Sequence, residues 1–98
     1  IDGESAEDNY GVGVSLSSNG NIVAIGAPYN DGSGADSGHV RIYDWNESAW
    51  VQVGSDIDAE AAGDYSGDSV SLSDDGSKVA IGAWSNNGNS GHVRIYEF

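Results

Sequence analysis

Short apolar runs alternate with glycine-rich stretches along the whole chain. Residues 14–17 read Val-Ser-Leu-Ser, residues 70–73 read the same, and this strict alternation predicts strands with one buried face. Residues 22–27, Ile-Val-Ala-Ile-Gly-Ala, are apolar throughout, which favours a strand covered on both faces. No stretch has a convincing helical period, so the pattern predicts an all-β protein.

A further strand is predicted where apolar side chains alternate with large polar or aromatic ones. Val40 and Ile42 should point to one face, and Arg41, Tyr43 and Trp45 to the other. Neither face is purely polar, so we expect both faces of this strand to pack against neighbours.

Asparagine–glycine and aspartate–glycine pairs separate the first two strands of each set. Asn19-Gly20 and Asp75-Gly76 are typical of two-residue hairpin turns of type I′, because both central positions of that turn need a positive φ. Such tight turns offer too few oxygen atoms for a calcium ion, so we expect no calcium there.

The chain contains two copies of one sequence repeat, which indicates two copies of one structural unit. Gly-His-Val-Arg-Ile-Tyr at residues 38–43 returns at residues 91–96, an offset of 53, whereas Ile1 matches Ile57 at an offset of 56. The second copy is therefore three residues shorter, and the loss falls between Ala27 and Gly38, where a loop tolerates it. A repeat of this kind is typical of arrays and propellers.

The repeat divides the chain into two predicted units. The first covers residues 1–53, with strands at about 12–17, 21–27, 38–45 and 50–53; the second covers residues 54–98, with strands at about 68–73, 78–83 and 91–97. Four antiparallel strands in about fifty residues are typical of a β-propeller blade. We therefore predict two four-stranded blade repeats in an incomplete ring, the last lacking its fourth strand.

Several motifs carry a resemblance to a known family. They are Asp-x-x-Gly ending at Gly11 and Gly67, then Val-Ser-Leu-Ser, Val-Ala-Ile-Gly-Ala-Pro at residues 23–28, and Gly-His-Val-Arg-Ile-Tyr. In this combination the chain resembles the FG-GAP repeat β-propeller family, with the blades of integrin α-subunits and of secreted microbial and algal proteins. The resemblance implies a non-enzymatic structural or adhesive repeat module, extracellular or at the cell surface.

The chain departs from the family pattern at two places. Tyr10-Gly11 and Ser66-Gly67 stand where the family has Phe-Gly. The turns between the first two strands also lack the aspartate-rich loop of calcium-binding members. The resemblance therefore implies the fold and does not carry over a metal site.

Charge restricts the possible partners. The chain has 16 acidic and 3 basic side chains and a net charge of −13, which disfavours binding to nucleic acid or to anionic membrane surfaces. No apolar run approaches the length of a membrane span, so membrane insertion is not expected. With no cysteine, disulfides and thiolate metal sites are excluded.

Arg41 and Arg94 occupy the same position in the two units. They could form a recurring anion site, but we favour structural ion pairs, because an arginine in a packed strand must be paired. The partners would be Asp8 and Asp64 or the repeated Asp2 and Asp58. We expect Arg94→Met to destabilise the fold for that reason.

The loops supply the remaining candidates. Asp31 and Asp36 carry oxygens that suit calcium, although turn chemistry accounts for the same residues without a metal. Trp84 and Tyr29 could stack on a sugar ring, and Asn46 begins an N-glycosylation sequon. The alternative function is thus a carbohydrate- or calcium-dependent binding module that uses residues 29–36 and 84–89. No other cofactor is expected, and no catalytic motif indicates an enzyme.

Packing of the repeats leads to two final expectations. Six equivalent apolar pairs should be mostly buried: Val14/Val70, Leu16/Leu72, Val23/Val79, Ile25/Ile81, Val40/Val93 and Ile42/Ile95. Two blades leave two sheet faces without neighbours, since closed propellers use ~4–8 blades. We therefore expect this chain to pack with identical copies or with further blades of the same parent chain, in which the sequence after Phe98 would resume the fourth strand.

Overall fold

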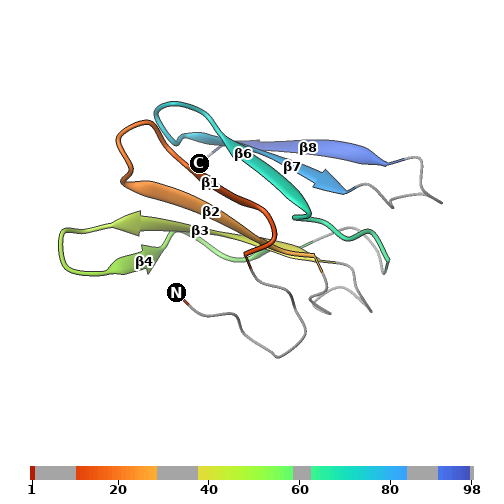
Figure 1. Cartoon of the computed structure of the whole chain (residues 1–98), viewed down its shortest axis with the longest axis horizontal. Helices are drawn as coiled ribbons and strands as arrows, with labels where there is room; N and C mark the ends of the chain where they lie inside the picture. The colour runs from red at the N-terminus through yellow and green to blue at the C-terminus, as the bar shows by residue number, and fades with distance from the viewer. Residues whose placement is uncertain (2–10, 29–37, 59–62, 84–90, 98) are drawn as a thin grey trace.

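A computed structural model describes residues 1, 11–28, 38–58, 63–83 and 91–97. These residues form eight strands in two antiparallel sheets and contain no helix (Figure 1). The first sheet contains β1 (Val14–Leu16), β2 (Ile22–Ala27), β3 (His39–Trp45) and β4 (Trp50–Gln52) in that order, and β5 (Ile57–Asp58) also pairs with β3. The second sheet contains β6 (Ser69–Leu72), β7 (Lys78–Ala83) and β8 (His92–Glu97). The all-β prediction is confirmed.

Strand β5 is the element that the sequence pattern did not predict. It forms because β4 pairs only with the end of β3, from Tyr43 to Trp45, and leaves the start of β3 unpaired on that side. Ile57 and Asp58 fill this place by pairing with Val40 and His39. The chain after β4 therefore stays attached to the first sheet before it enters the second.

The two sheets repeat the same register. Ala24 pairs with Ile42 across β2 and β3, and Ala80 pairs with Ile95 across β7 and β8. The pairing of β1 with β2 likewise matches that of β6 with β7. Residues that are equivalent in the sequence repeat are thus equivalent in strand position and in the face to which they point.

The hairpin turns differ from the predicted type I′. Gly20 N donates to Ser17 O over 3.0 Å and Ser17 N donates to Ile22 O over 2.8 Å, so the loop has four residues. Only Gly20 has a positive φ, 76°, and Asn19 does not. The Asn19 side-chain oxygen accepts from Asn21 N and Ser17 Oγ, which stabilises a turn centred one residue earlier. The second turn, with Gly76 at φ 75°, has the same bonds, so the type I′ prediction is wrong for both.

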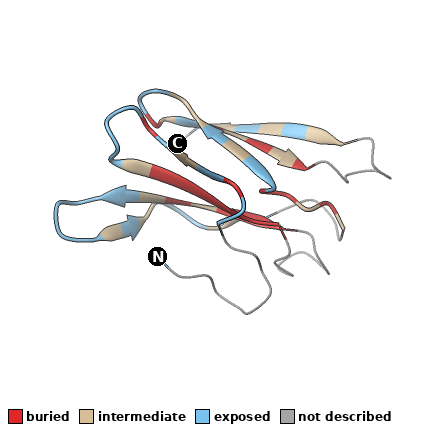
Figure 2. Ribbon diagram, viewed as in Figure 1, coloured by how far each residue is buried: buried red, intermediate tan, exposed pale blue. Residues whose placement is uncertain are grey.

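The two sheets stack face to face, and the core lies between them (Figure 2). Ala24, Val40 and Ile42 of the first sheet meet Val79 and Ile81 of the second. Partly buried side chains surround this cluster, among them Ile22, Ile57, Val70, Leu72 and Tyr96. The described strands form these two layers and no closed ring.

The equivalent apolar residues of the two units are not buried alike. Val40 and Ile42 are 0% and 2% exposed, but their equivalents Val93 and Ile95 are 67% and 70% exposed. Val14 and Leu16 are 55% and 57% exposed as well. The prediction that all six pairs are mostly buried is wrong for these four residues. Val93 and Ile95 point away from the first sheet, and no described segment covers them. Val14 and Leu16 lie on β1 at the edge of its sheet, whereas Val23 and Ile25, which point to the same face from β2, are buried.

Candidate functional site

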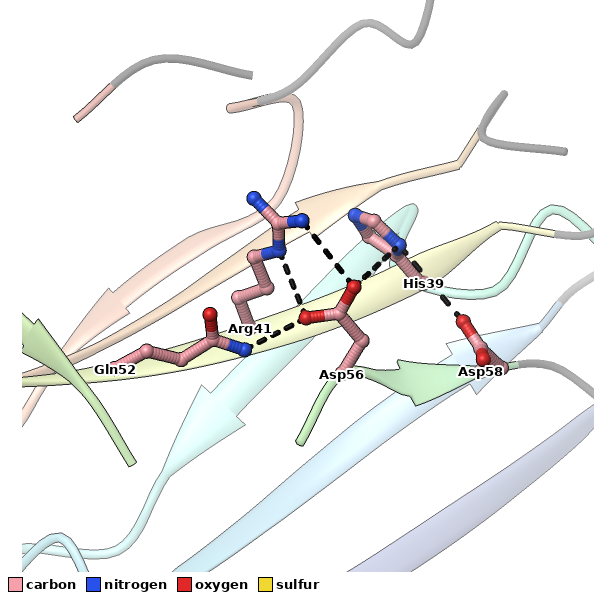
Figure 3. Close-up of polar contacts among 5 residues, drawn as sticks. All are labelled: His39, Arg41, Gln52, Asp56 and Asp58. Carbon is pink, nitrogen blue, oxygen red and sulfur yellow. Dashed lines mark hydrogen bonds and ion pairs between the residues drawn. The ribbon is translucent and has the colours of Figure 1, made fainter. Parts of the chain in front are cut away.

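A polar cluster on β3 joins three segments of the first sheet (Figure 3). Arg41 Nε donates to Asp56 Oδ1 over 2.9 Å and a second guanidinium nitrogen donates to Asp56 Oδ2 over 3.2 Å. Gln52 Nε2 of β4 donates to the same Asp56 Oδ1 over 2.6 Å. The arginine and the aspartate thus form a bidentate pair. Both side chains are mostly shielded from solvent, which strengthens the two charge-assisted hydrogen bonds.

The charges of the ion pair reinforce each other. The hydrogen bonds from Arg41 hold the pKa of Asp56 below its usual value, and the donation from Gln52 adds to the effect. The hydrogen bond to Asp56 in turn raises the pKa of Arg41, so the guanidinium stays charged. Because Asp56 engages the guanidinium, the arrangement fixes the segment before β5 onto β3 and does not present Arg41 to an anionic ligand.

His39 lies beside this pair and is almost completely buried. Its Nδ1 is 3.7 Å from Asp56 Oδ2 and 3.8 Å from Asp58 Oδ1, which is too long for hydrogen bonds (Figure 3). Its Nε2 has no hydrogen-bond partner in the described structure. Among the described residues, no group of three or more His, Asp or Glu side chains is placed to hold a metal ion.

The repeat singles out the arginine of this cluster in the sequence, but nothing in the sequence singles out its carboxylate. Asp56 precedes a two-residue strand without any periodicity and is one of 16 acidic residues, so no sequence signal singled it out. Asp64 is buried, while Asp8 lies outside the described residues. On β8, Arg94 donates to Tyr96 Oη over 2.9 Å. The pairing of either arginine with Asp8 or Asp64 stays a prediction.

The other candidates are spread over loops. Asp31, Asp36, Tyr29 and Trp84 all lie outside the described residues. Asn46 is exposed after β3, and its Oδ1 accepts from Ser48 N and Ala49 N over 3.0 and 2.9 Å. These bonds account for the turn, and glycosylation of Asn46 stays a prediction.

A seam of glycines joins the two sheets, and it is the site that the repeat motifs build. Gly13, Gly26 and Gly38 of the first unit face the backbone of Ser66 and Gly67. A Cβ on Gly26 would overlap Gly67 O, and one on Gly13 would lie 2.6 Å from it. Gly67 has φ 94°, and a Cβ there would lie 2.7 Å from His39 O. The close approach therefore requires glycine on both sides of the seam.

Hydrogen bonds continue the seam along β1 and β6. Leu72 N donates to Ser15 Oγ over 3.0 Å, and both the backbone nitrogen and the hydroxyl of Ser18 donate to Asp74 O over 2.9 Å. The sheets are thus held by backbone contact and polar bonds as well as by the apolar core. The sequence signal for this seam was visible in the repeated glycines, but their partners needed the structure.

The comparisons with known proteins add no family. No family model matches the chain, and neither the search of curated proteins nor the search of solved structures found a match. In the described part of the chain, no helix is long and apolar enough to cross a bilayer.

Proposed function

We propose that the chain is a non-enzymatic structural or adhesive repeat module, in which each unit is an FG-GAP-like blade of a β-propeller or of a propeller-like assembly. The observation that carries the proposal is the glycine seam. The motif glycines Gly26 and Gly67, from different units, touch each other, and the strand motifs of both units fill the core between the sheets. The shared residues thus serve contact between repeats.

The polar cluster supports the same reading. A catalytic or ligand site would leave its charged groups open toward a cavity. Arg41 and Asp56 instead hold each other and fasten β5 to the first sheet. The charge of −13 suits an extracellular or cell-surface setting where dissolved salts screen it, and we propose that location.

Glycan-array binding with and without calcium tests this function. For a structural module we expect no saturable glycan binding and the same melting temperature in calcium and in chelator. The double variant Asp31→Asn, Asp36→Asn serves as the matched control. Calcium-dependent glycan capture that this variant abolishes would replace the proposal with a binding module that uses residues 29–36.

A further inference from the structure

The outer face of the second sheet is a chemical copy of the inner face of the first. The seam positions Gly26, Gly38, Val40 and Ile42 have the equivalents Gly82, Gly91, Val93 and Ile95. In the first sheet these positions are covered by the second unit. In the second sheet the same positions are open, and Val93 and Ile95 are the most exposed large apolar side chains of the described structure.

A hollow marks the place where the seam is open. It measures about 430 Å³ and is lined by Asp68, Ser69, Gly82, Ala83, Gly91, His92 and Val93. In the first sheet, the segment from Ser66 to Asp68 fills the equivalent place over Gly26. The hollow therefore has the position and the lining of a seat for such a segment.

The opposite end of the molecule carries a matching segment. Gly11 has φ 98° and Gly67 has φ 94°, so the two backbones have the same shape. Gly11 N donates to Gly26 O over 2.9 Å, and Gly67 N donates to the equivalent Gly82 O over 3.1 Å. Among the described residues, nothing lies within 4 Å of where a Cβ on Gly11 would stand, whereas a Cβ on Gly67 would clash with His39 O.

The strand beside Gly11 is uncovered in the same way. Val14 and Leu16 are exposed, whereas their equivalents Val70 and Leu72 pack against the core between the sheets. Val23 and Ile25 of β2 point to the same face as Val14 and Leu16 and are buried, so the open part of this face is β1. The exposed side chains of β1 and of β8 are therefore the counterparts of side chains that meet in the internal junction.

We propose that the outer face of β6–β8 binds a second copy of this chain in the register of the internal junction. The Gly11 segment of the second copy enters the hollow over Gly82. Its Val14 and Leu16 cover Val93 and Ile95, and its Leu16 N donates to Ser71 Oγ, as Leu72 N donates to Ser15 Oγ within one chain. This inference rests on the proposed function and names the partner of that repeat.

The contact joins the β1 face of one copy to the outer face of β6–β8 of another. The first copy therefore still has an open β6–β8 face, and the second still has an open β1 face. Such a head-to-tail contact continues until the copies close into a ring or extend as a filament. It differs in this respect from a two-fold dimer, in which the same face would meet itself.

Substitutions on both sides distinguish the second junction from the internal one. On the side of the hollow, Ser69, Asp74 and Lys78 stand where the internal junction has Gly13, Ser18 and Ile22. On the side that enters it, Tyr10 and Val12 stand where the internal junction has Ser66 and Asp68. Ser69 Oγ lies over Gly82 and must rotate to admit the Gly11 segment. A net charge of −13 on each copy also opposes contact, so association should strengthen as salt is added.

Complementation of two blocked faces tests the register. Ile95→Asp blocks the outer face of β8 and Leu16→Asp blocks the face of β1. Both side chains are exposed, so neither change removes a core contact. By sedimentation velocity in high salt, we expect the unaltered chain to associate with rising concentration, each variant to stay a monomer, and an equimolar mixture to form dimers and nothing larger.

Controls separate docking from folding. Val51→Asp, at an exposed position on β4 away from the hollow, should associate like the unaltered chain. Circular dichroism must show the same cooperative melt for all variants; if an aspartate variant unfolds, Ile95→Thr and Leu16→Thr replace the pair with the same expectation. Dimers of either variant alone, or a mixture that stays monomeric, would overturn the proposal.

Failure of the sedimentation experiment can be told apart from failure of the glycan-binding experiment. An unaltered chain that is folded and monomeric at every concentration and salt level would overturn docking of a second copy and leave the structural role in place. Glycan capture that depends on calcium would overturn the structural role and leave the docking.

Discussion

The two units carry the same apolar side chains on the same strands, and they differ in what lies next to them. Val40 and Ile42 are buried because the second sheet covers them, whereas Val93 and Ile95 are in solvent at matched positions. Figure 2 shows the contrast between β2, which is buried along nearly its whole length, and β8, where intermediate and exposed residues alternate. The neighbouring sheet therefore decides the burial of these two equivalent pairs, and the identity of a side chain sets only how much its burial would stabilise the fold.

The matched arginines share a contact within their own strand, and the chain after β4 supplies a further partner to Arg41. Arg41 interacts with Tyr43 as Arg94 does with Tyr96. Arg41 also donates to Asp56, which in turn accepts from Gln52. Pairs of equivalent residues are natural controls for one another.

The largest effect is expected at the glycine seam. Gly67→Val should lower the free energy of unfolding by about 3–5 kcal/mol, because it adds a clash with His39 O to the strain of a positive φ. Gly11→Val has the same φ but an open surrounding, so strain alone predicts about 1–2 kcal/mol. Urea unfolding of both variants at low protein concentration measures the difference. Equal losses would show that the seam contributes nothing beyond backbone conformation.

Truncation of the matched isoleucines comes next. Ile42→Ala should cost about 2–5 kcal/mol, since it opens a cavity in the core between the sheets. Ile95→Ala removes an exposed side chain and should change stability by less than about 0.5 kcal/mol. Thermal or urea unfolding of the dilute protein gives both values. A large loss for Ile95→Ala would mean that its face is covered even in the monomer.

The ion pair on β3 predicts an intermediate effect. Asp56→Asn should cost about 1–3 kcal/mol because it removes charge-assisted hydrogen bonds to Arg41. Asp58→Asn is the matched control, since the side chain of Asp58 is half exposed and lies 3.8 Å from His39. We expect a change below about 0.5 kcal/mol there. If Asp56→Asn and Asp58→Asn had the same free energy of unfolding, the ion pair would not hold the segment before β5 against β3.

The pH dependence of the Asp56 variant checks the same contact. The pKa of Asp56 is lowered in the folded state, so its contribution to stability is complete above the unfolded value of about 4 and is lost as the pH falls through the folded value. The unaltered chain should therefore lose its advantage over Asp56→Asn on acidification. A constant difference from neutral to acid pH would exclude a role for the charge.

The smallest effect belongs to the second hairpin turn. Asp75 Oδ1 accepts from Ser77 N, Ser77 Oγ and Ser73 Oγ, which lowers the pKa of Asp75 to about 2. The stabilisation should be present above about pH 4 and lost toward pH 2. Asn19 makes the equivalent bonds in the first turn, so Asp75→Asn should leave neutral stability nearly unchanged and remove this part of the acid dependence. Melting curves of the unaltered chain and of Asp75→Asn between pH 2 and pH 5 measure this acid dependence. If the melting temperatures of the two proteins changed with pH in the same way, the stabilising role of the Asp75 carboxylate would be contradicted.

The strands were predictable because their signal is local. Alternation in Val-Ser-Leu-Ser and the continuous apolar run of β2 place these strands where the structure has them. The repeat also predicted which residues would be equivalent. The turn type was not predictable, because Asn19-Gly20 fits both a type I′ turn and a four-residue loop, and the side-chain bonds of Asn19 decide between them.

The site was less predictable than the strands because its contacts are not local. Asp56 pairs with Arg41 only after β5 has joined β3, and a two-residue strand leaves no periodic signal. The exposure of Val93 depends on a neighbouring sheet, which no property of residue 93 reveals. The motif glycines recur in both units, but their close approach and the partner of each one followed only from the stacking of the sheets.

Thiol labelling at Val93 tests the central claim most directly. The chain contains no cysteine, so single variants report one position each. Under reducing conditions we expect Val93→Cys to react rapidly in dilute solution and progressively more slowly as protein and salt concentration rise. Val51→Cys should react at one rate throughout and Ile42→Cys should stay protected. A Val93→Cys rate that does not depend on protein concentration would contradict the account that a second copy covers this face.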